Sequence, residues 1–192
     1  MKSLILIIIT TALVNNVVLS QFLGICSFLG VSRYIKTSFS LGAAVIFVIT
    51  VASAVANLLY TYILTPLNLD YLKTIVFILV IAALVQMVEM FTKKTSPPLY
   101  KALGIYLPLI TTNCCVLGAA ELNAKADRGI LASTIFGLCS GIGFAIAVIL
   151  FASLRERLAI SKIPRPFQGA AIALITAGIL AMAFMGFSGL VK

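Results

Sequence analysis

The stretch FLGICSFLG, residues 22–30, places a cysteine between two glycines inside a run from Ser3 to Ser32 that carries no charged residue. A related stretch, CCVLG at residues 114–118, lies in the second half of the chain. Counted from Cys26 and from Cys114, both stretches read Cys-x-x-Leu-Gly. The fold therefore has to accommodate two apolar, cysteine-containing elements, one in each half.

The composition indicates that the solvent of this protein is lipid. Hydrophobic residues make up 62% of the 192 residues and charged residues only 10%, whereas soluble domains have about 25% charged residues. The chain has no histidine, which excludes histidine metal sites and Ser-His-Asp triads. The net charge is +9, but the basic residues lie between apolar runs, which is typical of membrane topology and not of nucleic-acid binding.

The apolar runs predict an all-α integral membrane protein with a single membrane domain, residues 1–192. A hydrocarbon core of ~30 Å requires about 20 apolar residues per helix. The six expected transmembrane helices are Leu4–Val31, Phe39–Leu64, Leu72–Phe91, Leu99–Ala120, Ile130–Leu154 and Phe167–Val191. We expect Thr65-Pro66 to end the second span and Lys93-Lys94 to end the third. The first run is too long for a signal peptide and lacks a small-x-small cleavage site, so we expect it to be a mature span.

The distribution of lysine and arginine predicts the orientation of these spans. Nine basic residues fall in the first, third and fifth connections, and five fall on the other side or at the ends. Cytoplasmic loops carry the excess of basic residues in membrane proteins. We therefore expect the odd connections to be cytoplasmic and both termini to lie outside.

The two cysteine elements indicate an internal repeat. A shift of 88 residues places Cys26 on Cys114, Leu29 on Leu117 and Gly30 on Gly118. The spans then divide into two three-helix repeats, about 1–92 and 99–192. An odd number of spans inverts the second repeat in the membrane, as in many transporters whose functional site lies near the midplane on discontinuous helices.

The local sequence predicts that the first and fourth spans are broken near the midplane. Gly24 and Gly30 flank the first cysteine, and Pro108 precedes the polar run at residues 111–113 in the fourth span. Glycine lets the backbone turn and proline removes a backbone donor. Because polar groups are costly in lipid, we expect residues 111–113 to point inward. The alternative is that these glycines and threonines only allow helices to pack closely.

The four cysteines all lie in apolar segments and none in a loop, which argues against a secreted disulfide framework. Packing is the simplest role for Cys115 and Cys139. The repeat relates Cys26 to Cys114, so this pair is the candidate metal-binding set. Zinc and iron–sulfur sites usually have four protein ligands, so a partner chain would have to supply the other two. Soft thiolates favour iron–sulfur over hard cations, and the residues alone indicate a possible shared redox metal site.

Three segments of the chain resemble a known family: FLGICSFLGVS at residues 22–32, LGIYLPLITTNC at 103–114, and a tail with ITAG at 175–178 and MGFSGLVK at 185–192. The chain is similar over its whole length to the membrane proteins represented by the A subunit of the Rnf electron-transport complex. The homologous E subunit of the sodium-translocating NADH:quinone reductase (Nqr) is similar too.

The resemblance implies a multi-pass component of a translocase in the bacterial inner (plasma) membrane. The Rnf complex transfers electrons between reduced ferredoxin and NAD and couples this to sodium or proton transport. In that family, the A subunit pairs with a homologue of inverted topology, the E subunit, and assembles with further Rnf subunits. Each of the pair contributes two cysteines to one intramembrane [2Fe-2S] cluster, and the motif assigns these to Cys26 and Cys114 here.

The same resemblance gives this chain no catalytic residue of its own, since flavins and the nicotinamide site belong to other subunits. Residues expected to shape the cluster pocket are Gly24, Gly30, Thr112, Asn113 and Gly118. Cys115 stands where the family usually has a small apolar residue. Three alternatives remain open: an Nqr-type subunit, a non-redox inverted-repeat transporter or channel component, and a thiol–disulfide relay through Cys114 and Cys115.

Overall fold

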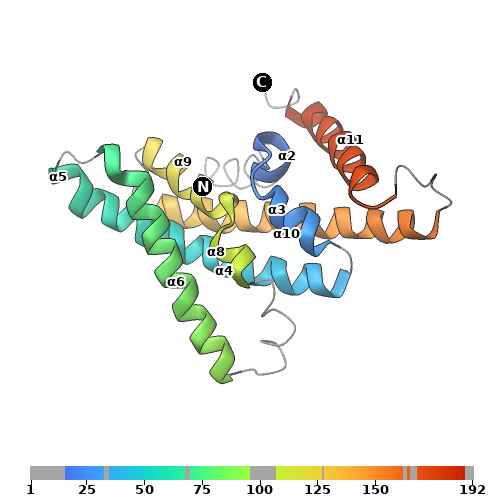
Figure 1. The fold of residues 1–192 in the computed structure, drawn as a ribbon. Coiled ribbons are helices and arrows are strands. Elements are labelled where there is room, and N and C mark those ends of the chain that lie inside the picture. Colours follow the sequence, from blue (N-terminus) through green and yellow to red (C-terminus); the bar gives the residue numbers. More distant parts are fainter. Residues whose placement is uncertain are drawn as a thin grey trace.

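The computed structural model describes residues 16–32, 35–67, 70–95, 107–126, 128–161, 164 and 168–188, and these residues form helices without a strand (Figure 1). The helices are α2 (Val17–Gln21), α3 (Ile25–Val31), α4 (Ile35–Leu59), the π-helix η2 (Tyr60–Leu64), α5 (Thr65–Leu67), the 3-10 turn η3 (Asp70–Leu72), α6 (Lys73–Thr95), α8 (Leu107–Thr111), α9 (Cys114–Lys125), α10 (Ile130–Ile160) and α11 (Ala170–Ser188). The all-α prediction is confirmed for this part of the chain.

Three helical segments within the described residues are long and apolar enough to cross a membrane: Ile35–Leu64, Lys73–Met90 and Ile130–Ile160. They correspond to the second, third and fifth predicted spans. The apolar stretch Ala170–Gly186 is shorter and corresponds to the sixth. The first and fourth predicted spans are described only in part, from residue 16 and from residue 107, and both are interrupted there.

The expectation that Thr65-Pro66 and Lys93-Lys94 end their helices was wrong. The second span continues through Pro66 into α5, because η2 widens the helix just before the proline, where the Thr65 N–H bonds to the Tyr60 carbonyl. The Thr65 hydroxyl donates to the same carbonyl at 2.9 Å. A π-bulge of this kind relieves the clash that a proline ring makes with the preceding turn. The third span continues to Thr95, with Lys93 and Lys94 in its last turn, where cations complement the helix dipole.

Helices α4 and α10 lie side by side and antiparallel along the centre of the molecule (Figure 1). Glycines bring their backbones together: a Cβ added at Gly42 would lie 3.0 Å from the Ala145 Cβ, and one at Gly141 would lie 2.9 Å from the Ile46 Cα. Small residues at the interface are typical of helix packing in membranes. These two helices correspond to the predicted second and fifth spans, which therefore run in opposite directions.

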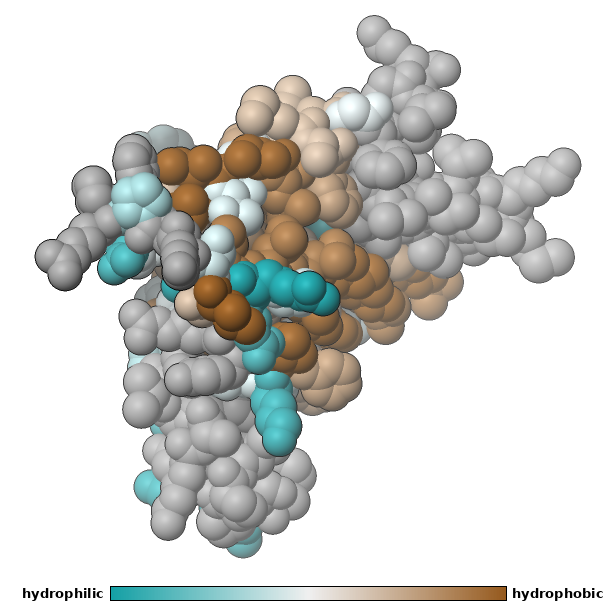
Figure 2. All heavy atoms as spheres, turned by 90° about the vertical axis from the view of Figure 1, so that its right-hand side faces the viewer, coloured by the Kyte–Doolittle hydropathy of each residue, from teal (hydrophilic) through white to brown (hydrophobic). Residues whose placement is uncertain are grey.

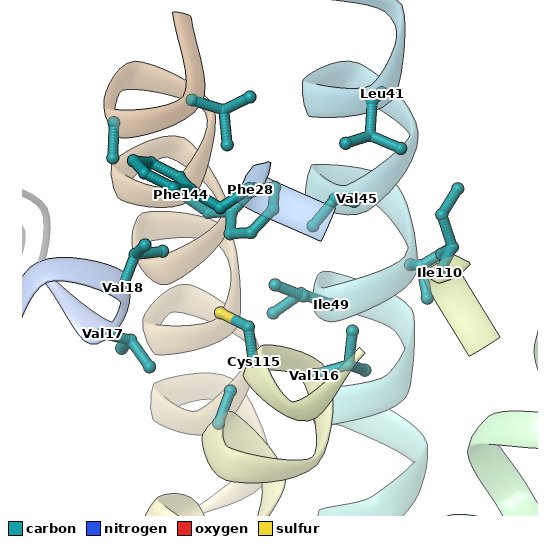
Figure 3. Close-up of a cluster of buried hydrophobic side chains, with 14 of the residues drawn as sticks. Val17, Val18, Phe28, Leu41, Val45, Ile49, Ile110, Cys115, Val116 and Phe144 are labelled. Carbon is teal, nitrogen blue, oxygen red and sulfur yellow. The ribbon is translucent and has the colours of Figure 1, made fainter. Parts of the chain in front are cut away.

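The broken helices pack on this central pair. Side chains from α2, α3, α8 and α9 meet those of α4 and α10 in one buried cluster, which includes Val17, Phe28, Ile49, Ile110, Cys115 and Phe144 (Figure 3). In contrast, α6 and α11 expose large apolar side chains, such as Leu79 and Met182. Hydrophobic residues cover much of the described surface in Figure 2, as expected of a protein surrounded by lipid and other membrane proteins.

Candidate metal centre

The first helix break separates α2 from α3 and lies at residues 22–24. Phe22 has φ 56° and Gly24 has φ 83°, both in the left-handed region. Asn16 fixes the start of α2, since its side-chain oxygen accepts from the Val18 N–H at 3.1 Å and its amide donates to the Gly143 carbonyl at 2.8 Å. The chain therefore turns sharply here, and α3 starts in a new direction at Ile25.

The second break separates α8 from α9 and lies at residues 112–113. The Asn113 side-chain oxygen accepts from the Cys115 N–H at 3.1 Å and so caps the N-terminus of α9. The Thr112 hydroxyl donates to the Pro108 carbonyl at 3.0 Å. The described parts of these two segments are therefore interrupted where the sequence predicts a break, so close packing of unbroken helices does not describe either segment.

The two breaks contact each other. The Gly24 N–H donates to the Cys114 Sγ at 2.8 Å. A Cβ added at Gly24 would lie 3.0 Å from Phe144 and 3.2 Å from both the Asn113 Oδ1 and the Cys115 Cβ. Only glycine satisfies both the positive φ and this close approach. One predicted pocket residue, Gly24, thus lies directly against another, Asn113.

The four cysteines fall into two classes by exposure. Cys115 is 0% exposed and directs its sulfur into the buried cluster (Figure 3), and Cys139 is 2% exposed within α10. Cys26 is exposed at the second position of α3, and Cys114 is half-buried at the first position of α9. The two cysteines related by the repeat are therefore the two that another molecule can reach.

Cys114 opens onto a groove between α6 and the second break. The groove has a volume of about 370 Å³ and is lined by Ile78, Ile81, Ala82, Thr111, Thr112, Asn113, Cys114 and Leu117. The Asn113 amide nitrogen is buried and has no hydrogen-bond partner within the described part of the chain. Buried donors are nearly always paired, so this amide is available to an acceptor supplied from outside the described residues.

The remaining predicted pocket residues, Gly118, Gly30 and Thr112, differ in their surroundings. Gly118 faces the first break, because a Cβ there would lie 2.5 Å from the Leu23 Cδ1. Gly30 is exposed near the end of α3, where a Cβ would lie 3.4 Å from Leu109. Thr112 is exposed, and it lines the same groove as Cys114. Its hydroxyl is satisfied by the backbone one turn earlier, and this local bond removes the need for a buried partner.

One functional candidate, Arg155, is not apparent from the sequence. The Arg155 Nη1 in α10 donates to the Leu29 carbonyl at 2.7 Å and to the Ser32 hydroxyl at 2.9 Å. In the sequence, this arginine counts only as one of the basic residues that predict the fifth connection to be cytoplasmic. No local pattern could have identified its contacts, because the two partners lie 126 and 123 residues earlier in the chain. Within the described residues, no three potential metal ligands lie close enough together to hold a metal ion.

Comparison with known proteins covers the whole chain. Residues 4–191 match the family described as "Rnf-Nqr subunit, membrane protein". The chain is 57% identical over 192 residues to the A subunit of the ion-translocating oxidoreductase complex of Actinobacillus pleuropneumoniae, covering 100% of both chains. It is 58% identical over 193 residues to the protein of the same name from Pseudomonas aeruginosa, again over 100% of both chains. The corresponding Vibrio atlanticus protein is 54% identical over 192 residues, with 100% of both chains covered.

Proposed function

Because the chain belongs to the Rnf-Nqr family of membrane subunits, we propose that it carries electrons within an ion-translocating oxidoreductase complex of the ferredoxin:NAD type. The chain is a membrane subunit of an ion-translocating oxidoreductase complex and works there together with other subunits. The observation that carries the proposed role is the contact between the two breaks, at which the Gly24 N–H bonds to the Cys114 thiol. This contact joins the cysteine elements of the two halves.

The cofactor that fits this junction is a [2Fe-2S] cluster shared with a homologous partner subunit. Cys26 and Cys114 would supply two thiolate ligands, and the partner would supply the other two. Two observations support the fit. The Asn113 amide beside Cys114 is a buried donor without a partner among the described residues, and the Gly24 N–H already donates to the Cys114 sulfur. Hydrogen bonds to the sulfurs tune the reduction potential of such clusters.

A cluster of this type accepts and releases one electron at a time. Near the midplane it would divide a crossing of ~30 Å into two shorter transfers. This chain would contribute the thiolates, the backbone donor at Gly24 and the N-terminus of α9, where the helix dipole favours negative charge. The apolar cluster beneath the breaks would keep bulk water away from the site.

The test is to measure iron and acid-labile sulfide in the purified complex. Cys26→Ser and Cys114→Ser should each lower both contents and abolish electron transfer between ferredoxin and NAD. Cys139→Ala is the matched control, because its thiol is buried within α10, and it should retain wild-type iron content. Full electron transfer in Cys26→Ser would contradict the proposal.

A second candidate is a transporter component without a redox role. Broken helices beside an antiparallel helix pair, and an amide at Asn113 that is available to an outside acceptor, suit a substrate or ion pathway as well. The iron and sulfide measurement separates the two, since a transporter component would contain neither. A relay through Cys114 and Cys115 is disfavoured by the complete burial of Cys115. Wild-type activity of Cys115→Ala would exclude it.

A further inference from the structure

Helix α3 carries Cys26 and is only seven residues long. So short a helix has few hydrogen bonds of its own, so its contacts with other elements determine where it points. Cys26 is exposed, so α3 holds it outward on the side away from the packing contacts of Phe28. Whatever holds α3 therefore also sets the position of the Cys26 thiol.

The C-terminal end of α3 is held by a cation from α10. The Arg155 Nη1 bridges the Leu29 carbonyl and the hydroxyl of Ser32, which is 0% exposed. The last four carbonyls of a helix lack partners within the helix, and a cation there also complements the helix dipole. Hydrogen bonds from a charged donor are roughly twice as strong as neutral ones.

An aromatic contact reinforces this attachment one turn earlier on α10. The Phe151 ring stacks on the Phe28 ring with a centroid separation of 4.2 Å and an interplanar angle of 21°. The Arg155 guanidinium carbon lies 5.9 Å from the Phe151 ring centroid. Residues four apart lie on one face of a helix, so Phe151 and Arg155 form one surface of α10 that receives α3.

We propose that Arg155 is a positioning residue that fixes α3 and thereby holds Cys26 in the orientation a shared metal centre requires. The metal-centre part of this inference rests on the proposed function, whereas the control of Cys26 orientation does not. At its N-terminal end, α3 is fixed by the hydrogen bond from the Gly24 N–H to the Cys114 sulfur. Arg155 thus provides the attachment at the C-terminal end of α3, and it connects the helix that carries Cys26 to α10.

Arg155 is only partly enclosed by the described residues. Its side chain is half-buried and lines a groove of about 350 Å³ between the end of α10 and the start of α11. Arg157 lies two residues further along α10 and is exposed. Because residues two apart do not share a helix face, Arg157 provides a control with the same charge.

The experiment compares Arg155→Gln, Arg155→Lys, Ser32→Ala and Arg157→Gln in the purified complex. The readouts are the electron paramagnetic resonance line shape and midpoint potential of the cluster, and the rate at which maleimide labels Cys26. In the complex, the partner subunit would cover Cys26, so Arg155→Gln should broaden the signal, shift the potential and raise the labelling rate about tenfold through loss of the charge-assisted hydrogen bonds. Ser32→Ala should change the same quantities less, Arg155→Lys should restore them in part, and Arg157→Gln should match the wild type.

Arg155→Gln with wild-type line shape, potential and labelling rate would overturn the inference. If that variant does not assemble, Ser32→Ala and Arg155→Lys decide, and wild-type values for both would overturn it. A wild-type complex without a cluster signal would refute the proposed function instead. The Cys26 labelling rates would then still decide whether Arg155 positions α3.

Discussion

The two helix breaks share a sequence pattern but are built differently. The first uses backbone conformation, with Phe22 and Gly24 at positive φ and no side-chain cap on α3 among the described residues. The second uses a side chain, since Asn113 caps α9 from an ordinary extended conformation. As a result, Cys26 is exposed at the second position of its helix, whereas Cys114 is half-buried at the first. The Cys-x-x-Leu-Gly pattern marks the place of a break, and the residues before it determine its geometry.

The two half-helices also differ in how they are anchored. Helix α9 has twelve residues, and the Thr74 hydroxyl donates to its Glu121 carboxylate at 2.7 Å. Near its end, the Arg128 Nη1 donates to the Asn123 side-chain oxygen at 3.1 Å. Helix α3 is shorter and is attached through Gly24 at one end and Arg155 at the other. We therefore expect the first cysteine to be the more sensitive of the two to substitutions outside its own break.

The largest expected effect is at Gly24. Valine there would require a β-branched residue at φ 83° and would place its Cβ 3.0 Å from Phe144. Strain and overpacking should each cost about 1–3 kcal/mol. The free energy of unfolding in detergent should fall by roughly their sum. Gly178→Val is the control, because no described atom lies within 4 Å of a Cβ at that position. Equal stability of the two variants would show that the first break does not depend on Gly24.

Substitution of the two capping asparagines, Asn16 and Asn113, should affect the free energy of unfolding to different extents. Asn16→Ala removes both a cap and the hydrogen bond to Gly143, and should cost about 2 kcal/mol of unfolding free energy. Asn113→Ala removes only a cap, because the Asn113 amide nitrogen has no hydrogen-bond partner among the described residues. This substitution should therefore cost about 1 kcal/mol of unfolding free energy.

The matched control at the second break is Asn113→Ser, because serine retains capping ability and lacks the amide. It should keep near wild-type stability and still shift the midpoint potential of the cluster. An unchanged potential in both Asn113 variants would show that the amide does not act on the cofactor.

The smallest expected effect is at Gly118. Alanine there would place a Cβ 2.5 Å from the Leu23 Cδ1, which is the end of a flexible side chain. Leu23 can move, so the cost should be about 1 kcal/mol, reduced by the better helix propensity of alanine. In a Leu23→Ala background the substitution should be neutral or stabilising. A cost that persists in that background would show that the first break does not rest on Gly118.

Much of this architecture follows from the order of residues along the chain. The apolar runs predict the helices, and Gly24, Pro108 and the polar run at 111–113 predict where two of them break. The continuation through Pro66 could not be predicted, because it depends on hydrogen bonds of a π-bulge specific to residues 60–64. The role of Arg155 depends on a contact between the two halves of the chain, and no local pattern records it. In contrast, the packing role predicted for Cys115 is confirmed by its complete burial.

The most direct test of the account is electron paramagnetic resonance on the dithionite-reduced chain, copurified with its homologous partner. We predict a [2Fe-2S] signal in the wild-type pair that disappears in both Cys26→Ser and Cys114→Ser and persists in Cys139→Ala. An active, fully assembled wild-type complex in which the pair shows no such signal would contradict the account.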